Sequence, residues 1–405
     1  MNPGASSSLP LANPPPYLST VVTSRNDDHG GNLLRRMQIF VDAWFEQVRR
    51  HRLDAELIVV EWNPPPERPP LAQALRWPSD LKPGEARVIV VPAALHARYA
   101  HADRLPLYQF IAKNAGIRRA RGQFVLATNI DILLSSELAA FLAEKSLDPA
   151  IVYRNDRIDV SDAIVALPDG ADYLGFCNEH PIRINGPTWT VDLRDGRIHQ
   201  VFLSQRFEAI TRFFARLSHG AGLAGRLVRL ARMIAGVRRG LPPQGPPLSR
   251  RLWQTLGRAA PAPRPSTRSI PAHVNACGDF TLMAKSVWES LRGHPEYDGY
   301  SMHLDSIVLL AALASGLVRE EVLPYPMRHF HIDHSAGSGY TPEAEAKLFA
   351  RLRAKGIPYL SWDEVERLIQ AITVMPDRVR YNDDHWGLGN QTLAEILPAP
   401  SGQDP

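Results

Sequence analysis

An amide and a carboxylate stand two residues apart at the end of an apolar run. Residues 124–128 read FVLAT, and Asn129 and Asp131 follow before the chain becomes apolar again. A turn after a strand can bring alternate side chains to one place, and hard oxygen ligands favour Mg2+ or Mn2+. The spacing therefore predicts a divalent-metal site at Asp131. The alternative is that both residues only form a turn or cap the next helix.

Two other apolar runs also end in polar clusters. Thr23 to Asp28 close the run that begins at Tyr17, and Glu61 to Asn63 close the run that begins at Ala55. Apolar, β-branched runs predict strands, and a period near 3.6 residues predicts helices. The predicted strands are 17–27, 55–63, 86–93 and 122–131, and the predicted helices are 32–51 and 105–120. This order is typical of an α/β fold with a mostly parallel sheet flanked by helices, which binds ligands at the carboxyl ends of its strands. We therefore expect the three polar clusters to line one crevice.

The composition is that of a globular protein. The chain has 405 residues, 44% of them hydrophobic, which is enough for a large core. Its two cysteines, Cys177 and Cys277, exclude a disulfide framework and a cysteine-based zinc cluster. The first sixteen residues lack the basic start and apolar middle of a signal peptide, so a cytoplasmic location is expected. The apolar run from Ile307 to Val318 is shorter than the roughly 20 residues of a membrane span and is interpreted as a core helix.

Positive charge is concentrated in one segment. Arg206 to Arg268 holds thirteen arginines, no lysine and one acid, Glu208, although the net charge of the whole chain is only +4. Its pattern predicts a basic amphipathic helical insertion with a Pro-rich linker. Three interpretations remain open: peripheral contact with an anionic membrane, binding of a partner, or a solvated surface. The patterns typical of nucleic-acid recognition are missing, so no nucleic acid is expected as a partner.

The chain resembles a known family. The block from Lys113 to Asp131, KNAGIRRARGQFVLATNID, resembles the K-N-x-G…D-x-D block of nucleotide-sugar-dependent glycosyltransferases of the GT-A type, especially family-2-like members. STVVTSRND and ELIVVEWNPP resemble their nucleotide-binding strands. GDFTLMAKSVWESLRGHPE, followed by HLDSIVLLAALASG, resembles their acceptor half. The resemblance covers about Tyr17 to Arg157 and Val274 to His334. Asn129 departs from the motif, because it replaces the first Asp and leaves Asp131 as the expected metal ligand.

Composition and the resemblance together divide the chain, and the resemblance guides the choice of site residues. The divisions are a flexible tail (1–16), a nucleotide-sugar-binding half (17–187), the basic insertion and linker (188–270), an acceptor-binding and catalytic half (271–345) and a C-terminal helical segment (346–405). Asp305 is expected to be the catalytic base, although it could also act only as a helix cap. The metal ligands are expected to be Asp131, His331 and His334; the nucleotide-sugar contacts Thr23, Arg25, Asn26, Glu61, Lys113 and Asn129; and the acceptor contacts Gly278 and Asp279.

The implied reaction is transfer of a sugar from a nucleoside diphosphate sugar to a hydroxyl acceptor. The acceptor would be a glycan or glycolipid in polysaccharide or glycolipid assembly, and Mg2+ or Mn2+ would be the cofactor. A carboxylate that removes the acceptor proton, opposite a stabilised leaving group, favours inversion. Three alternatives stay open: a retaining GT-A glycosyltransferase, a nucleotidyltransferase, and a non-catalytic protein that binds nucleotide sugars.

Overall fold

The computed structural model of the chain describes residues 14–187, 189–200, 272–334, 342–361 and 381–402, together with 364, 365, 367, 368 and 371. The arginine-rich segment 206–268 lies outside the described residues. Its helical character and its membrane contact therefore stay predictions. Within the described ranges, no helix combines the length and apolar character needed to cross a membrane.

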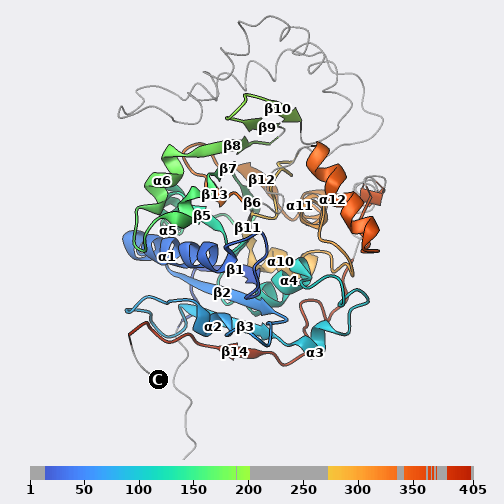
Figure 1. Cartoon of the computed structure of the whole chain (residues 1–405), viewed down its shortest axis with the longest axis horizontal. Coiled ribbons are helices and arrows are strands. Elements are labelled where there is room, and N and C mark those ends of the chain that lie inside the picture. Colours follow the sequence, from blue (N-terminus) through green and yellow to red (C-terminus); the bar gives the residue numbers. More distant parts are fainter. Residues whose placement is uncertain are drawn as a thin grey trace, which may run out of the picture.

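The core of the molecule is an eight-stranded, mostly parallel sheet (Figure 1). Its strands lie in the order β12 (Arg319–Val322), β6 (Ile151–Arg154), β11 (Phe280–Ala284), β4 (Phe124–Thr128), β1 (Leu18–Ser24), β2 (Ala55–Trp62), β3 (Ala86–Val91) and β14 (Ala394–Ile396). β1 pairs in parallel with β2 and β4, β2 with β3, and β12 with β6, whereas β11 and β14 run antiparallel to their neighbours. The predicted α/β class is confirmed. Both edge strands, β12 and β14, come from the second half of the chain, so segments far apart in the sequence form one sheet.

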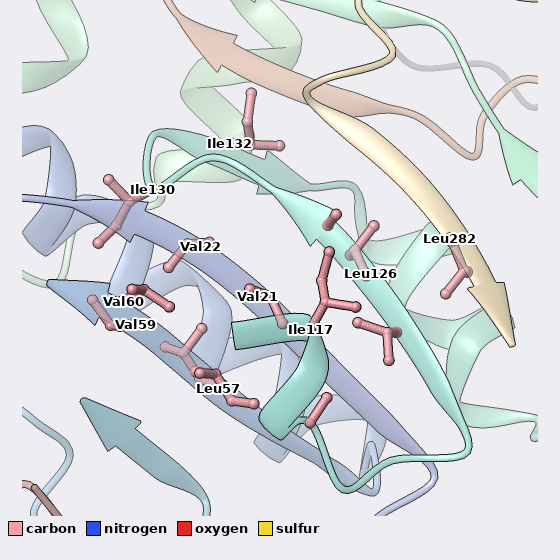
Figure 2. Close-up of a cluster of buried hydrophobic side chains, with 14 of the residues drawn as sticks. Val21, Val22, Leu57, Val59, Val60, Ile117, Leu126, Ile130, Ile132 and Leu282 are labelled. Carbon is pink, nitrogen blue, oxygen red and sulfur yellow. The ribbon is translucent and has the colours of Figure 1, made fainter. Parts of the chain in front are cut away.

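Helix α4 (Gln109–Arg119) covers one face of the central strands. Figure 2 shows its Ile117 among the apolar side chains of β1, β2 and β4, including Val21 and Leu126. The approach is close because α4 presents Gly116 to the sheet, where an added Cβ would stand 2.5 Å from Val21 Cγ1 and 2.9 Å from Val60 Cγ2. These strands are buried except for Ala55 at the start of β2, and their Val, Ile and Leu side chains form the core beneath the polar strand ends.

A second sheet of six strands adjoins the first (Figure 1). Its order is β10 (Ile198–Gln200), β9 (Trp189–Asp192), β8 (Pro181–Asn185), β7 (Arg157–Val160), β13 (His329–Ile332) and β5 (Ile132–Leu134). β13 pairs in parallel with β7, placing His331 opposite Asp159, and antiparallel with β5, placing His331 opposite Ile132. Because β5 directly follows the turn that carries Asp131, this pairing brings segments about 200 positions apart in sequence to one place.

The remaining helices cover these sheets and connect their strands. α1 (Leu33–His51) packs with both hydrophobic clusters: Met37 and Phe40 belong to the central core, and Ile39 and Ala43 to the core under the second sheet. The other elements are α2 (Leu71–Ala74), α3 (Ala93–His96), α5 (Ser136–Ala143), η1 (Asp162–Ala166), α6 (Tyr173–Glu179), α10 (Lys285–Leu291), α11 (Leu304–Ala314) and α12 (Pro342–Ala354). α1 thus packs against both sheets, and its Arg36 links the preceding loop, at His29 and Gly31, to Asp131.

Candidate functional site

One carboxylate and two imidazoles converge where the two sheets meet. Asp131 follows β4, His331 lies in β13 and His334 comes three residues later. Asp131 Oδ2 lies 3.9 Å from His331 Nε2 and 3.7 Å from His334 Nε2, and one ligand atom from each residue lies within 4.8 Å of the others. Small side-chain shifts would let one ion reach all three. The oxygen and nitrogen donors suit a divalent cation such as Mn2+ or Zn2+.

An arginine shares this carboxylate. Arg36 of α1 is buried, and its guanidinium lies 2.6 Å from Asp131 Oδ2 and donates to the backbone carbonyls of His29 and Gly31. The guanidinium therefore already places a positive charge at the cluster. The sequence gives no local signal for this role, because Arg36 is simply one of several arginines on a helix that begins at Leu33.

The pKa values of the two histidines shift in opposite directions. Burial lowers the pKa of His334 to about 4, so this imidazole is neutral at pH 7. Burial also lowers the pKa of His331, but the hydrogen bond to Asp159 and the charge of Asp131 outweigh that effect and leave the pKa above its usual value. An ion at this place would compete with the proton on His331, whereas the His334 ring is not protonated at pH 7.

A buried ionic network lies behind His331. Asp159 Oδ1 is 3.1 Å from His331 Nδ1, and both Arg157 and Arg183 pair with the same carboxylate. Burial raises the pKa of Asp159, yet Arg157 and the His331 hydrogen bond outweigh it and hold that pKa well below its usual range. The residues of this network come from β7 and β8 of the second sheet. Their place next to the cluster depends on the pairing of β7 with β13.

Asn129 is engaged by neighbouring side chains. Its Nδ2 donates to Asp279 Oδ1 at 2.5 Å, and its Oδ1 accepts from Gln109 Nε2 at 2.9 Å. The other oxygen of Asp279 pairs with Arg157 at 2.5 Å. Burial raises the pKa of Asp279, but the Arg157 charge outweighs it and lowers the pKa to about 2. A carboxylate at 129 would face the ionised Asp279, which explains an amide here. Gln109, which also accepts from Ser301, was missed by sequence reasoning.

The expected base and acceptor residues lie together. Asp305, in the first turn of α11, accepts the backbone N–H of Gly278 at 2.7 Å and that of Ser306 at 2.9 Å. Lys113 is fully buried and donates to the Gly278 carbonyl at 2.6 Å, and burial lowers its pKa to about 8. An added Cβ at 278 would stand 2.8 Å from Asp305 Oδ2, so a side chain there would displace the Asp305 carboxylate. Lys113 thus supports the backbone of the segment that carries Gly278.

Four of the six nucleotide-contact candidates lie at the carboxyl ends of β1 and β2, whereas Lys113 lies in α4 and Asn129 follows β4. Thr23 Oγ1 donates to the Val60 carbonyl and Asn26 Nδ2 to the Pro69 carbonyl, while Arg25 lies 3.4 Å from Asp27. Glu61 is fully buried and accepts from the backbone N–H of Leu71 at 3.0 Å; burial raises its pKa. Among the described residues, Glu61 Oε2 and Asn26 Oδ1 have no hydrogen-bond partner, which marks this strand edge as a place where a polar ligand group could bind.

Comparisons with known proteins leave the chain without an assigned family. No protein-family model matches it, and no curated protein matches it. The mannosyltransferase PcManGT from Pyrobaculum calidifontis, in complex with GDP-Man and Mn2+, is 13% identical with a TM-score of 0.37 over 93% of this chain and 72% of that chain. The catalytic domain of Drosophila β1,4-galactosyltransferase 7, in complex with xylobiose, is 7% identical with a TM-score of 0.31 over 82% of this chain and 79% of that chain.

Proposed function

We propose that the chain is a glycosyltransferase of the GT-A type that uses a nucleoside diphosphate sugar and a hydroxyl acceptor. The observation that carries the proposal is the convergence of Asp131, His331 and His334 from two distant segments. Asp159 behind His331 is linked through Arg157 to Asp279, the residue next to Gly278, which Asp305 holds. Asp131, His331, His334 and Asp305 are residues that the resemblance assigned to metal binding and to catalysis. Their assembly at the carboxyl edge of a mostly parallel sheet supports that assignment.

The donor end is formed by the cluster and by the ends of β1 and β2. Asp131, His331 and His334 would hold Mg2+ or Mn2+, and that ion would offset the charge of the leaving diphosphate. Arg36 adds a guanidinium at the same carboxylate, suited to phosphate oxygens. Thr23, Arg25, Asn26 and Glu61 would orient the nucleoside.

The acceptor end is formed by the segment that carries Gly278 and by the first turn of α11. Asp305 is half-buried and is held by the Gly278 and Ser306 N–H groups, so its orientation is fixed before substrate arrives. It would take the proton of the acceptor hydroxyl while that oxygen forms a bond to the anomeric carbon and the bond from this carbon to the diphosphate breaks. This geometry favours inversion. The acceptor is proposed to be a glycan or glycolipid.

Donor-sugar hydrolysis and transfer test the proposal. Wild type, Asp131→Ala and Asp305→Asn are compared on UDP-, GDP-, TDP- and CMP-sugars with Mg2+, Mn2+ or chelator. The matched control is Asp54→Asn, an exposed carboxylate at the amino end of β2 that pairs with Lys145. We expect one donor to be consumed in a metal-dependent way by wild type and control, with losses of at least 100-fold in both site variants.

The alternatives are separated in the same assays. Retention of the donor anomer in the product would favour the retaining GT-A reaction, and release of diphosphate from a nucleoside triphosphate would favour a nucleotidyltransferase. Binding of a nucleotide sugar without turnover would favour the non-catalytic protein. If no donor is bound or consumed, the proposal fails.

A further inference from the structure

The carboxylate of Asp159 lies fully buried behind His331. Its side chain has no exposed surface, and its Oδ1 lies 3.1 Å from His331 Nδ1. The other ring nitrogen, Nε2, lies 3.9 Å from Asp131 Oδ2. A neutral imidazole carries one N–H and one lone pair. Because a carboxylate can only accept, Asp159 keeps the N–H on Nδ1 and leaves the lone pair of Nε2 directed at the cluster.

Asp159 is itself fixed from several directions. Its Oδ1 lies 3.0 Å from Arg157 Nε, and its Oδ2 accepts from Arg183 at 2.8 Å and from Asn185 Nδ2 at 3.1 Å. The donors come from β7 and β8, and His331 stands opposite Asp159 in the ladder of β7 and β13. Both the carboxylate and the imidazole are therefore held by strands of one sheet, which leaves the ring little freedom to rotate.

The same network reaches the acceptor segment. Arg157 bridges Asp159 and Asp279, and Asp279 accepts from Asn129. A carboxylate needed only for stability would be satisfied by the two arginines. The additional hydrogen bond to His331 couples this ion pair to one of the two imidazoles that face Asp131.

We infer that Asp159 is a positioning residue, which fixes the tautomer and orientation of His331 so that Nε2 can bind a divalent cation together with Asp131 and His334. The inference rests on the metal site of the proposed function and assigns Asp159 no contact with the ion or substrate. Loss of an orienting carboxylate behind a metal-binding histidine typically weakens metal binding about 10- to 100-fold.

Metal affinity of the full chain is the first test. Mn2+ binding is measured by titration calorimetry for wild type, Asp159→Asn and the control Asp192→Asn. Asp192 is also a buried, ion-paired carboxylate of the second sheet, but its hydrogen bonds go to Arg194. We expect the dissociation constant to rise about 10- to 100-fold in Asp159→Asn and less than 2-fold in the control. Equal affinities in all three proteins, or wild type that binds no Mn2+, would overturn the inference.

A second measurement needs no variant at Asp159 and stays informative if Asp159→Asn does not fold. The 15N signals of the His331 ring in metal-free wild type, assigned by their loss in His331→Gln, report which nitrogen carries the proton. We expect a proton on Nδ1, and a ring protonated only on Nε2 would contradict the inference. A chain that binds Mn2+ as described but consumes no donor sugar would refute the proposed function while the positioning role stands.

Discussion

Replacement of Asn129 by Asp tests why this chain has an amide in the first position of the D-x-D-like motif. Asn129 Nδ2 donates to Asp279 Oδ1 at 2.5 Å. Burial raises the pKa of Asp279, but the charge of Arg157 outweighs this effect and lowers the pKa to about 2, so Asp279 is ionised at pH 7. Asn129→Asp would place a second carboxylate against the first. The hydrogen bond from residue 129 to Asp279 would be replaced by repulsion between two carboxylates. Gln109 Nε2 could still donate to the new side chain.

The magnitude follows from two limits. Two unit charges about 3 Å apart repel by roughly 5 kcal/mol at an effective dielectric constant of about 20. The protein can escape this repulsion by binding one proton, which costs about 4 kcal/mol at pH 7 for a carboxyl with an ordinary pKa near 4. We therefore expect Asn129→Asp to lower the free energy of unfolding by about 2–4 kcal/mol at pH 7.

The loss should depend on pH with a definite sign. The new carboxyl has a pKa raised in the folded state, so the folded variant binds its proton before the unfolded chain does as the pH falls. The stability difference from wild type is therefore largest at neutral pH and shrinks toward pH 4. Urea unfolding followed by tryptophan fluorescence at pH 7 and pH 5 measures it.

A swap variant and a metal titration complete this test. Asn129→Asp with Asp279→Asn restores one amide and one carboxylate, so part of the lost stability should return. If Asn129 instead belonged to the coordination shell of an ion, Asn129→Asp would bind Mn2+ more tightly. Wild-type stability at pH 7 together with tighter Mn2+ binding would refute the reasoning.

Three further predictions concern the core and the buried charges. Gly116→Ala places a methyl group 2.5 Å from Val21 Cγ1 and 2.9 Å from Val60 Cγ2, so urea unfolding should show a loss of about 1–3 kcal/mol, and an unchanged midpoint would contradict the close approach of α4. Arg154 is fully buried and donates to three backbone carbonyls of the segment 272–279. Arg154→Met should therefore lower the free energy of unfolding by about 2–4 kcal/mol and speed proteolysis of that segment. A variant as resistant to protease as wild type would contradict this anchoring role. Burial lowers the pKa of Lys113 to about 8, so between about pH 8 and 10 the unfolded chain binds more protons than the folded chain. The free energy of unfolding of wild type, relative to that of Lys113→Met, should therefore rise with pH in this range. A difference between the two proteins that does not change with pH would show that the ammonium is not desolvated.

Local patterns in the sequence determined the central elements. The apolar, β-branched runs predicted strands at 17–27, 55–63, 86–93 and 122–131, and the structure has them at Leu18–Ser24, Ala55–Trp62, Ala86–Val91 and Phe124–Thr128. The helices predicted at 32–51 and 105–120 are Leu33–His51 and Gln109–Arg119. These predictions worked because burial on one or both faces imposes a short-range period that a single sequence displays. The expectation that polar residues end the strands follows from the same runs.

Only the tertiary structure decided which of these polar residues meet. The second sheet was not predicted, and it is the pairing of β13 with β7 and β5 that sets His331 beside Asp159 and Asp131. Likewise, Arg36 reaches Asp131 only because α1 packs against both sheets, and Asn129 finds Asp279 only because β11 pairs with β4. Pairing between strands that are far apart in the sequence depends on which faces of the sheets and helices are buried against each other. The residues around His331 show no local pattern from which its partners could be predicted.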